Sequence, residues 1–395
     1  MMRAKEPGHD GPVADTLLTS TATNLLLRAA TLAPSLHNSQ PWAFGVGHRR
    51  VEVFAAPSRQ LRNTDPTGRS LLISCGAALF NLRVAAEHLG FHPRVRLLPD
   101  DDDPTLVAVV EVDHRHPPPG GLGVHYAAIP ARRTNRRPFR DQTIPHSVLA
   151  ALGEAARAEG AMLRMSDDPD EVARIIDLLH DADLADHTEP ARTTEREAWV
   201  GGVRRDDGIP AHPLGPRPSE PRTPFRDLGQ AVAVARDYAA FETTPTVAIL
   251  STTQDQRVDW LRAGQALERL LLAATAAGLS ASFLNQPLEQ DDLRCLVRSP
   301  TTGVGHSHMI LRLGYGDKVP ATPRRPLAQV RRQLRATPMN APAEAIASPG
   351  ATGGTGDHRQ ARSRDRAAAP VVNDEQLVVL RLLVDRRRSA TMAIT

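Results

Sequence analysis

The sequence is poor in cysteine, lysine and aromatic residues, and each shortage argues against a class of protein. Its 395 residues include two cysteines and 4% aromatic side chains. Cys75 and Cys295 lie in apolar surroundings and form no Cys-x-x-Cys pair, so we expect both to be buried, with no disulfide framework and no metal site. Lys5 and Lys318 are the only lysines among 48 basic residues. A nucleic-acid surface, in which basic and aromatic side chains alternate, is not indicated.

The net charge of +3 overstates how basic the chain is. Residues 341–395 hold 8 arginines against 6 acidic residues, which leaves 40 basic against 39 acidic side chains in the first 340 residues. The most apolar stretch, residues 270–284, is shorter than the roughly 20 residues that a membrane-spanning helix needs. The first twelve residues lack the apolar core of a signal peptide. We therefore expect a cytoplasmic protein with neither a nucleic-acid nor a membrane partner.

Hydrophobic periodicity predicts alternating helices and strands. The expected helices cover residues 16–33, 69–89, 147–159, 169–184 and 260–277. The expected strands cover residues 51–54, 94–98, 106–112, 246–250 and 309–313. The Pro-rich residues 116–121 are typical of a connector, and the Pro/Gly/Arg-rich residues 201–225 are typical of a long loop that lies over a site. Residues 337–395 are too poor in apolar residues for a core, so we predict a disordered tail with a possible short helix over 371–388.

Two of the expected helices resemble each other. Residues 76–90 and 264–278 align without a gap, with identical residues at 7 of 15 positions. Two Ala/Leu-rich helices can match by chance, but the similar flanking segments favour an internal duplication.

The segment PSLHNSQPW, residues 34–42, is the most informative for function. Asn38 and Gln40 lie in a loop that Pro41 stiffens and Trp42 anchors, so backbone and amide donors could bind a flat heteroaromatic ring. An ordinary capped turn with Trp42 in the core is the alternative.

Arginine pairs suggest an anion site. In RRTNRRPF, residues 132–139, alternate side chains of an extended segment share a face, so Arg132, Thr134 and Arg136 can converge on one phosphate. A solvated arginine run is the alternative. Arg324 and Arg325 lie between prolines and either complete this site or belong to a surface tail. FLNQPLE, residues 283–289, follows a long helix, where a backbone N–H could meet the edge of a ligand.

Together these segments resemble the nitroreductase superfamily, and specifically its Acg branch of FMN-binding oxidoreductases, over about residues 20–330. The resemblance implies an α+β, nitroreductase-like three-layer α-β-α fold. It also implies a dimer with FMN in the subunit interface. One subunit would supply an Arg/Ser phosphate grip, a backbone contact after its central helix and basic residues near its end. The neighbour would supply the Pro-Ser loop, which in this chain is residues 34–42.

The motifs are divided between the two halves of the chain. The first half, residues 14–122, has the Pro-Ser loop but no Arg-x-Ser-x-Arg grip upstream of it. The second half, residues 123–336, has the remaining parts and no second Asn-x-Gln-Pro-Trp. We therefore predict a fused pseudo-dimer with one FMN site, for which a monomer suffices, and a lid insertion near residues 199–225.

The resemblance also implies a role for each matching residue. Arg132, Thr134 and Arg136 would hold the phosphate, helped by Arg324 or Arg325. Pro34, Ser35, Leu36 and Asn38 would line the flavin ring. Leu284, Asn285 and Gln286 would present backbone toward its N5 edge. An extra residue before Phe139 leaves open whether Arg136 or Arg137 takes the inner position.

The implied activity is electron transfer from NADH or NADPH through the flavin to a nitroaromatic or quinone-like small molecule. Because the flavin performs this chemistry, no catalytic acid or base is expected. The alternative is a flavin-sequestering stress or dormancy protein with little turnover.

Overall fold

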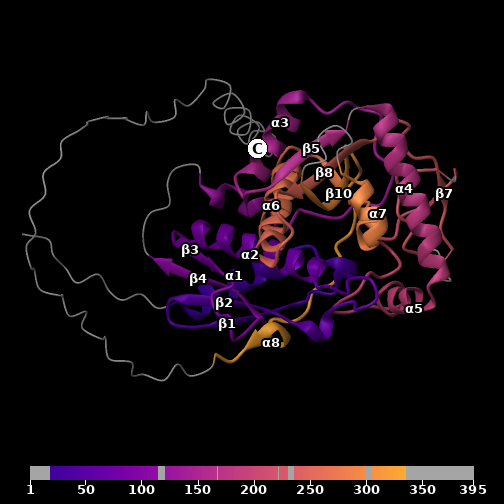
Figure 1. Ribbon diagram of the computed structural model, residues 1–395. Helices are drawn as coiled ribbons and strands as arrows, with labels where there is room; N and C mark the ends of the chain where they lie inside the picture. Colours follow the sequence, from indigo (N-terminus) through magenta and orange to yellow (C-terminus); the bar gives the residue numbers. More distant parts are fainter. Residues whose placement is uncertain are drawn as a thin grey trace, which may run out of the picture. The chain divides into compact units, whose positions relative to one another are not determined.

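Two sheets, built mainly of antiparallel strands, lie on either side of a layer of helices in the computed structural model (Figure 1). The model describes residues 18–113, 121–166, 168–220, 222–229, 235–298 and 305–334. Contacts divide the chain into two units, residues 1–336 and 337–395. The predicted tail and its short helix, and the predicted connector up to residue 120, lie outside the described residues.

The first sheet has strand order β11-β1-β2-β4-β3, and the second has β5-β8-β10-β9. The strands of the first sheet are β1 (Trp42–Val46), β2 (Arg50–Ala55), β3 (His92–Leu97), β4 (Leu106–Asp113) and β11 (Arg331–Arg332). Those of the second are β5 (Met162–Ser166), β8 (Thr246–Thr252), β9 (Ser280–Phe283) and β10 (His306–Gly314). Two short strands, β6 (Arg217–Pro218) and β7 (Tyr238–Ala239), pair separately.

The described helices are α1 (Ser20–Thr31), α2 (Arg69–His88), α3 (His146–Arg157), α4 (Pro169–Thr188), α5 (Pro190–Trp199), α6 (Arg257–Ala276), α7 (Asp291–Leu296) and α8 (Leu327–Val330). The expected helices and strands are confirmed, with small shifts at their ends. Helix α6 begins earlier than expected because Gln256 and Asp259 form a capping box at its start. Gly90 and Gly278 follow α2 and α6 with φ of 83° and 78°, as a left-handed helix end requires.

The order of elements is repeated in the two halves. Each half has a sheet of four antiparallel strands in the same order, β1-β2-β4-β3 and β5-β8-β10-β9, with a 20-residue helix between its second and third strands. At the crossing of these helices, a Cβ on Gly76 would lie 2.2 Å from the carbonyl oxygen of Leu261, and a Cβ on Gly264 2.0 Å from that of Ile73. The contact is reciprocal, because the ungapped alignment that pairs Gly76 with Gly264 also pairs Ile73 with Leu261. This symmetry is consistent with the predicted duplication.

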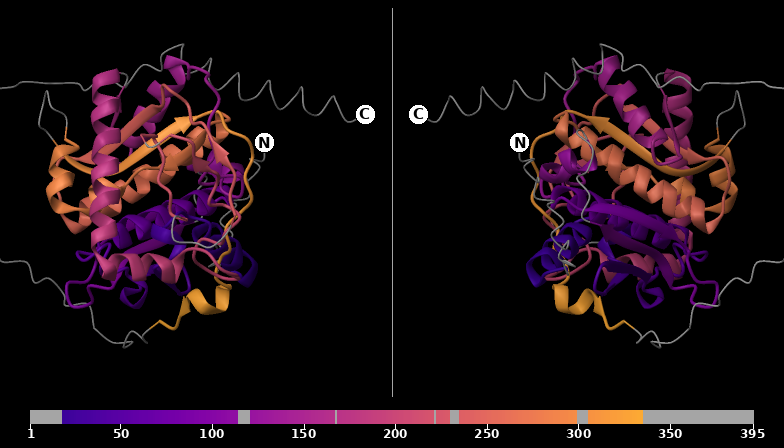
Figure 2. Two further views of the ribbon diagram at one scale, coloured as in Figure 1. Left: turned by 90° about the vertical axis from the view of Figure 1, so that its right-hand side faces the viewer. Right: turned by 90° about the vertical axis from the view of Figure 1, so that its left-hand side faces the viewer.

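The second sheet is covered on both faces, as the three-layer fold requires. Val247 and Ile249 of β8 pack with Ile175 and Leu179 of α4. Their neighbour Ala248 faces the opposite way, into the cluster that contains α6. Alternate residues of one strand therefore enter two different cores. The two side views show α4 at the edge of the molecule and the helical layer between the sheets (Figure 2).

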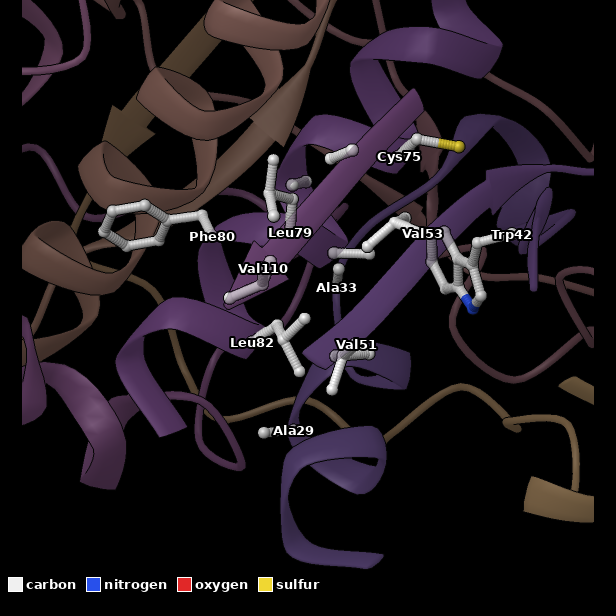
Figure 3. Close-up of a cluster of buried hydrophobic side chains, with 14 of the residues drawn as sticks. Ala29, Ala33, Trp42, Val51, Val53, Cys75, Leu79, Phe80, Leu82 and Val110 are labelled. Carbon is white, nitrogen blue, oxygen red and sulfur yellow. The ribbon is translucent and has the colours of Figure 1, made fainter. Parts of the chain in front are cut away.

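The core of the first half lies between its sheet and α2. Val51 of β2, Val110 of β4 and Leu82 of α2 belong to one buried cluster (Figure 3). Trp42 and Cys75 are fully buried in the same cluster. Trp42 is therefore a core anchor.

The prediction that Cys295 is buried is wrong. Cys295 is exposed on α7, a short helix with no buried residues, because its apolar sequence neighbours do not enclose it. Helix α2 is long and apolar enough to cross a membrane by length and composition, and 83% of its most apolar window is buried inside the protein. It serves here as a core helix.

Candidate functional site

One cavity brings together the segments singled out in the sequence, from both halves of the chain. Of the predicted residues, those that line it are Pro34, Ser35, Leu36, Asn38, Arg132, Thr134, Arg136, Asn285 and Arg324. The start of α2 and residues Ile209, Arg226 and Leu228 also belong to the wall. The cavity is therefore a joint product of the first half, the second half and the predicted lid segment.

The Pro-Ser loop has an unusual backbone. His37, Asn38 and Gln40 have φ of 46°, 56° and 50°, in the left-handed region that side chains other than glycine rarely adopt. The hydroxyl of Ser35 accepts a hydrogen bond of 2.9 Å from the backbone N–H of Gln40, which closes the loop. Several such residues in succession persist only where surrounding contacts hold them, and they are concentrated at functional sites.

The side chain of Asn38 supplies one of these contacts. Its Nδ2 donates to the carbonyl oxygens of Gly208 (2.8 Å) and Pro323 (3.0 Å), and its Oδ1 accepts from Arg324 (3.0 Å). Asn38 lines the cavity as expected, but its amide is engaged by the protein and is not free to face a ring. No local pattern predicts these partners, because they lie far away along the chain.

Within the Pro-Ser loop, His37 lines the cavity and carries two ring nitrogens that no described residue hydrogen-bonds. Its side chain is 5% exposed, and neither ring nitrogen has a hydrogen-bond partner among the described residues. Burial and the charges of Arg226, Arg196 and Arg136 hold its pKa well below the usual range. His37 is therefore a neutral imidazole at pH 7, with both nitrogens available to a ligand.

Arg132 offers donors to an anion. It is 5% exposed, its Nη2 donates to the carbonyl of Leu32 (3.3 Å), and its Nε and Nη1 have no hydrogen-bond partner among the described residues. Arg324 lies beside it, and burial together with the charge of Arg132 lowers the pKa of Arg324 to about 9. Buried guanidinium N–H groups without partners are suited to phosphate oxygens.

The structure brings Arg136, not Arg137, to the cavity. Arg137 is exposed, and its carbonyl accepts from Arg312. Arg136 donates to the carbonyl of Pro213 (3.3 Å), and burial and Arg226 lower its pKa to about 10. Thr134 forms an isolated bridge with Ala281 of β9, which holds the arginine segment against the second sheet.

Three predicted residues do not line the cavity. The N–H of Leu284 donates to the carbonyl of Ile310 (2.9 Å), so this N–H is already engaged within the sheet. The side chain of Gln286 is buried and bonds Asp183 (3.3 Å). Arg325 donates to the carbonyl of Gln40 (3.2 Å), so it secures the Pro-Ser loop from outside. In these segments the expected donors already bond to the protein: Leu284 to β10 and Arg325 to the Pro-Ser loop.

Sequence reasoning missed several lining residues, because nothing local marks them. Arg226 forms a two-pronged ion pair with Glu289, at 2.5 and 2.6 Å. His308 of β10 shares a 2.6 Å hydrogen bond with Thr252, and burial and Arg69 lower its pKa to about 3. In the described part of the chain no group of three or more His, Cys, Asp or Glu could hold a metal ion.

Comparisons with known proteins give the family. No protein-family model matches the chain. It is 35% identical over 314 residues to "Putative NAD(P)H nitroreductase Rv3131" of Mycobacterium tuberculosis, covering 77% of this chain and 89% of the relative. It is 30% identical over 323 residues to "Putative NAD(P)H nitroreductase acg" of the same organism, covering 80% and 97%.

Solved structures to which the chain shows some similarity include the FMN-dependent nitroreductase NfnB from Mycobacterium smegmatis in complex with NADPH. That protein is 18% identical, with a TM-score of 0.33, and the match covers 54% of this chain and 100% of that chain. At this TM-score it adds nothing to the assignment, which rests on the sequence relatives and on the agreement of the motifs. The chain therefore belongs to the Acg-type NAD(P)H nitroreductase family.

Proposed function

We propose that the chain is an FMN-dependent oxidoreductase that takes electrons from NADH or NADPH and passes them to a small organic acceptor, nitroaromatic or quinone-like. One FMN site lies between the two halves, so a single chain suffices for activity, and the protein works in the cytoplasm. The observation that supports this most directly is that Nε and Nη1 of the buried Arg132 make no hydrogen bond to the described residues, in a cavity that both halves line.

The residues present fit a phosphorylated, flat heteroaromatic group. Arg132, Arg136 and Arg324 would hold its phosphate, with Thr134 fixing the segment that carries two of them. Pro34, Ser35, Leu36 and Asn285 would lie along the ring. Ile73, Leu267 and Met309 also line the cavity and supply apolar surface.

When bound, the flavin supplies the transfer of hydride and electrons, and the chain supplies position and electrostatics. Arg132 and Arg324 neutralise the phosphate charge. The rigid Pro-Ser loop fixes the ring plane, because its turn is held by Ser35 and by the clamp at Asn38. His37 offers a neutral hydrogen bond to an oxygen of the acceptor. The apolar wall would keep water away from the bound ring.

The test is the visible spectrum of the purified protein before and after anaerobic addition of NADPH or NADH, followed by a nitroaromatic or a quinone. We expect a yellow protein that bleaches with the nucleotide and regains its colour with the acceptor. A protein that stays colourless after incubation with FMN would contradict the proposal.

A second function, flavin sequestration with little turnover, is favoured by the closure over the Pro-Ser loop. Gly208 and Asn38 exchange two hydrogen bonds, and Asp206 accepts a further one from Gln40 (2.8 Å). A closed lid would keep nucleotides from the flavin. Bound flavin that resists NADPH but bleaches with dithionite would favour this function over catalysis.

A further inference from the structure

A buried carboxylate stands behind the phosphate grip. Glu268 of α6 is 0% exposed and follows Leu267, which lines the cavity. Its Oε1 lies 3.6 Å from Nε of Arg132, and the side-chain amide of Asn81 stabilises the charged carboxylate at a geometry short of a full hydrogen bond. Glu268 therefore contacts Arg132 without itself lining the cavity.

Such a group is sensitive to the charge around it. Burial raises the pKa of Glu268 to about 7, against the opposing effects of Arg132, Asn81 and Arg324. These three residues come from the arginine segment, from α2 and from the C-terminal segment, and they are the groups that face it. The protonation state of a buried carboxylate changes readily when the charges around it change.

The two halves differ at this position. The alignment that pairs Gly76 with Gly264 pairs Glu268 with Phe80, which is a fully buried apolar side chain of α2 (Figure 3). The packing of the central helices is therefore compatible with an apolar residue here. The carboxylate occurs in the half that supplies Arg132, Arg136 and Arg324 to the cavity.

We propose that Glu268 is a positioning residue for the flavin phosphate: it balances Arg132 and Arg324 when no phosphate is bound, and it takes up a proton when one binds. This inference rests on the proposed function, in which the cavity holds FMN. The incoming phosphate competes with the carboxylate for the same two guanidinium groups. A proton from solvent then bonds to a carboxylate oxygen of Glu268, and no covalent bond in the protein or the ligand breaks. Arg132 and Arg324 then interact with the phosphate without a competing negative charge.

The test is proton uptake on binding. FMN and riboflavin, which lacks the phosphate, are titrated into flavin-free protein at pH 8 in two buffers of different ionisation enthalpy. The phosphate of FMN, whose second pKa is about 6, is already a dianion at this pH. We expect the wild type to take up protons with FMN and not with riboflavin. The variant E268Q should lose most of the FMN-linked uptake.

Affinity gives a second readout. Between pH 6 and pH 8 the Kd for FMN of the wild type should rise relative to that of E268Q, by up to about tenfold per pH unit. Titration of the phosphate itself is common to both proteins and cancels in the ratio. The matched control is E159Q, which removes another mostly buried carboxylate, bound to Arg83 and Arg269 outside the cavity. It should leave proton uptake unchanged.

Equal proton uptake by wild type and E268Q, with both binding FMN, would overturn the inference and leave the proposed function intact. If E268Q does not fold, the comparison of FMN with riboflavin in the wild type decides, since equal uptake with the two ligands also overturns it. A wild type that binds neither ligand would contradict the proposed function itself.

Discussion

Asn38 and Gly208 hold each other through two hydrogen bonds. The side-chain amide of Asn38 donates to the carbonyl of Gly208 at 2.8 Å, and the N–H of Gly208 donates to the carbonyl of Asn38 at 3.2 Å. This pair joins the Pro-Ser loop of the first half to the segment expected to act as a lid. It couples the left-handed turn beside the cavity to the segment that we expect to cover the cavity.

Replacing Asn38 with Ala should loosen this cover. The change removes the bonds to Gly208, Pro323 and Arg324, each worth about 1 kcal/mol, while the backbone bond can remain. We expect the FMN release rate to rise by roughly tenfold or more and the lid to become sensitive to protease. Release is followed by flavin fluorescence after dilution. An unchanged release rate would show that the Asn38 contacts do not limit access.

Replacing Arg132 and Arg136 together with Ala should release FMN. Two buried positive charges are lost from the proposed grip, and hydrogen bonds to charged groups contribute roughly 1.5–3 kcal/mol each. The measurement is the ratio of flavin to protein absorbance after gel filtration. Arg137→Ala is the matched control, since Arg137 lies in the same segment and is exposed. A double variant that purifies fully yellow would refute the phosphate assignment.

His37→Phe should slow reoxidation of reduced flavin by an oxygen-bearing acceptor. The unpartnered imidazole offers one neutral hydrogen bond, worth about 1 kcal/mol, so a loss of up to about tenfold is expected. His37→Gln should restore part of the rate because an amide can also donate. Stopped-flow reoxidation measures the effect, with flavin content as the control. Equal rates in the wild type and His37→Phe would remove His37 from the acceptor site.

His308 should make the protein less stable in mild acid. Its folded pKa of about 3 lies below its ordinary value of 6.5. Between these values the unfolded chain binds a proton that the folded chain does not, so stability is fully present above pH 6.5 and falls as the pH drops. The slope is about 1.4 kcal/mol per pH unit.

In His308→Gln this part of the slope should disappear, as measured by urea unfolding at pH 7, 6 and 5. His146→Gln, at an exposed position on α3, is the control. Parallel slopes in the wild type and His308→Gln would show that His308 is not kept neutral by folding.

Gly76→Ala should destabilise the protein through the helix crossing. The added Cβ would lie 2.2 Å from the carbonyl oxygen of Leu261, which forces α2 and α6 apart at a cost of about 1–3 kcal/mol. Gly153→Ala in α3 is the matched control, because its nearest neighbour would be Arg157 at 3.8 Å. There the helix propensity of alanine should add about 1 kcal/mol. Urea denaturation compares the two, and equal stabilities would show that the crossing is not close-packed.

The elements and the motif segments were predictable from the sequence because local signals mark them. Periodicity located α2 and α6, and arginine spacing located the segment that carries Arg132 and Arg136. The roles of individual side chains were less predictable. Asn38 is held by carbonyls distant in the sequence, and Leu284 is held by the strand that contains Ile310. Arg226 and Glu268 reach the site through tertiary packing, for which no local pattern exists.

β11, the shortest strand of the first sheet, makes the two halves of the chain depend on each other as one heritable unit. β11 comes from the end of the second half and pairs in parallel with β1 of the first half. The segment that leads to it carries Arg324 into the cavity. A gene cut between the halves would therefore separate a strand from its sheet and an arginine from its site. The two halves, however similar in plan, therefore cannot be inherited or exchanged independently.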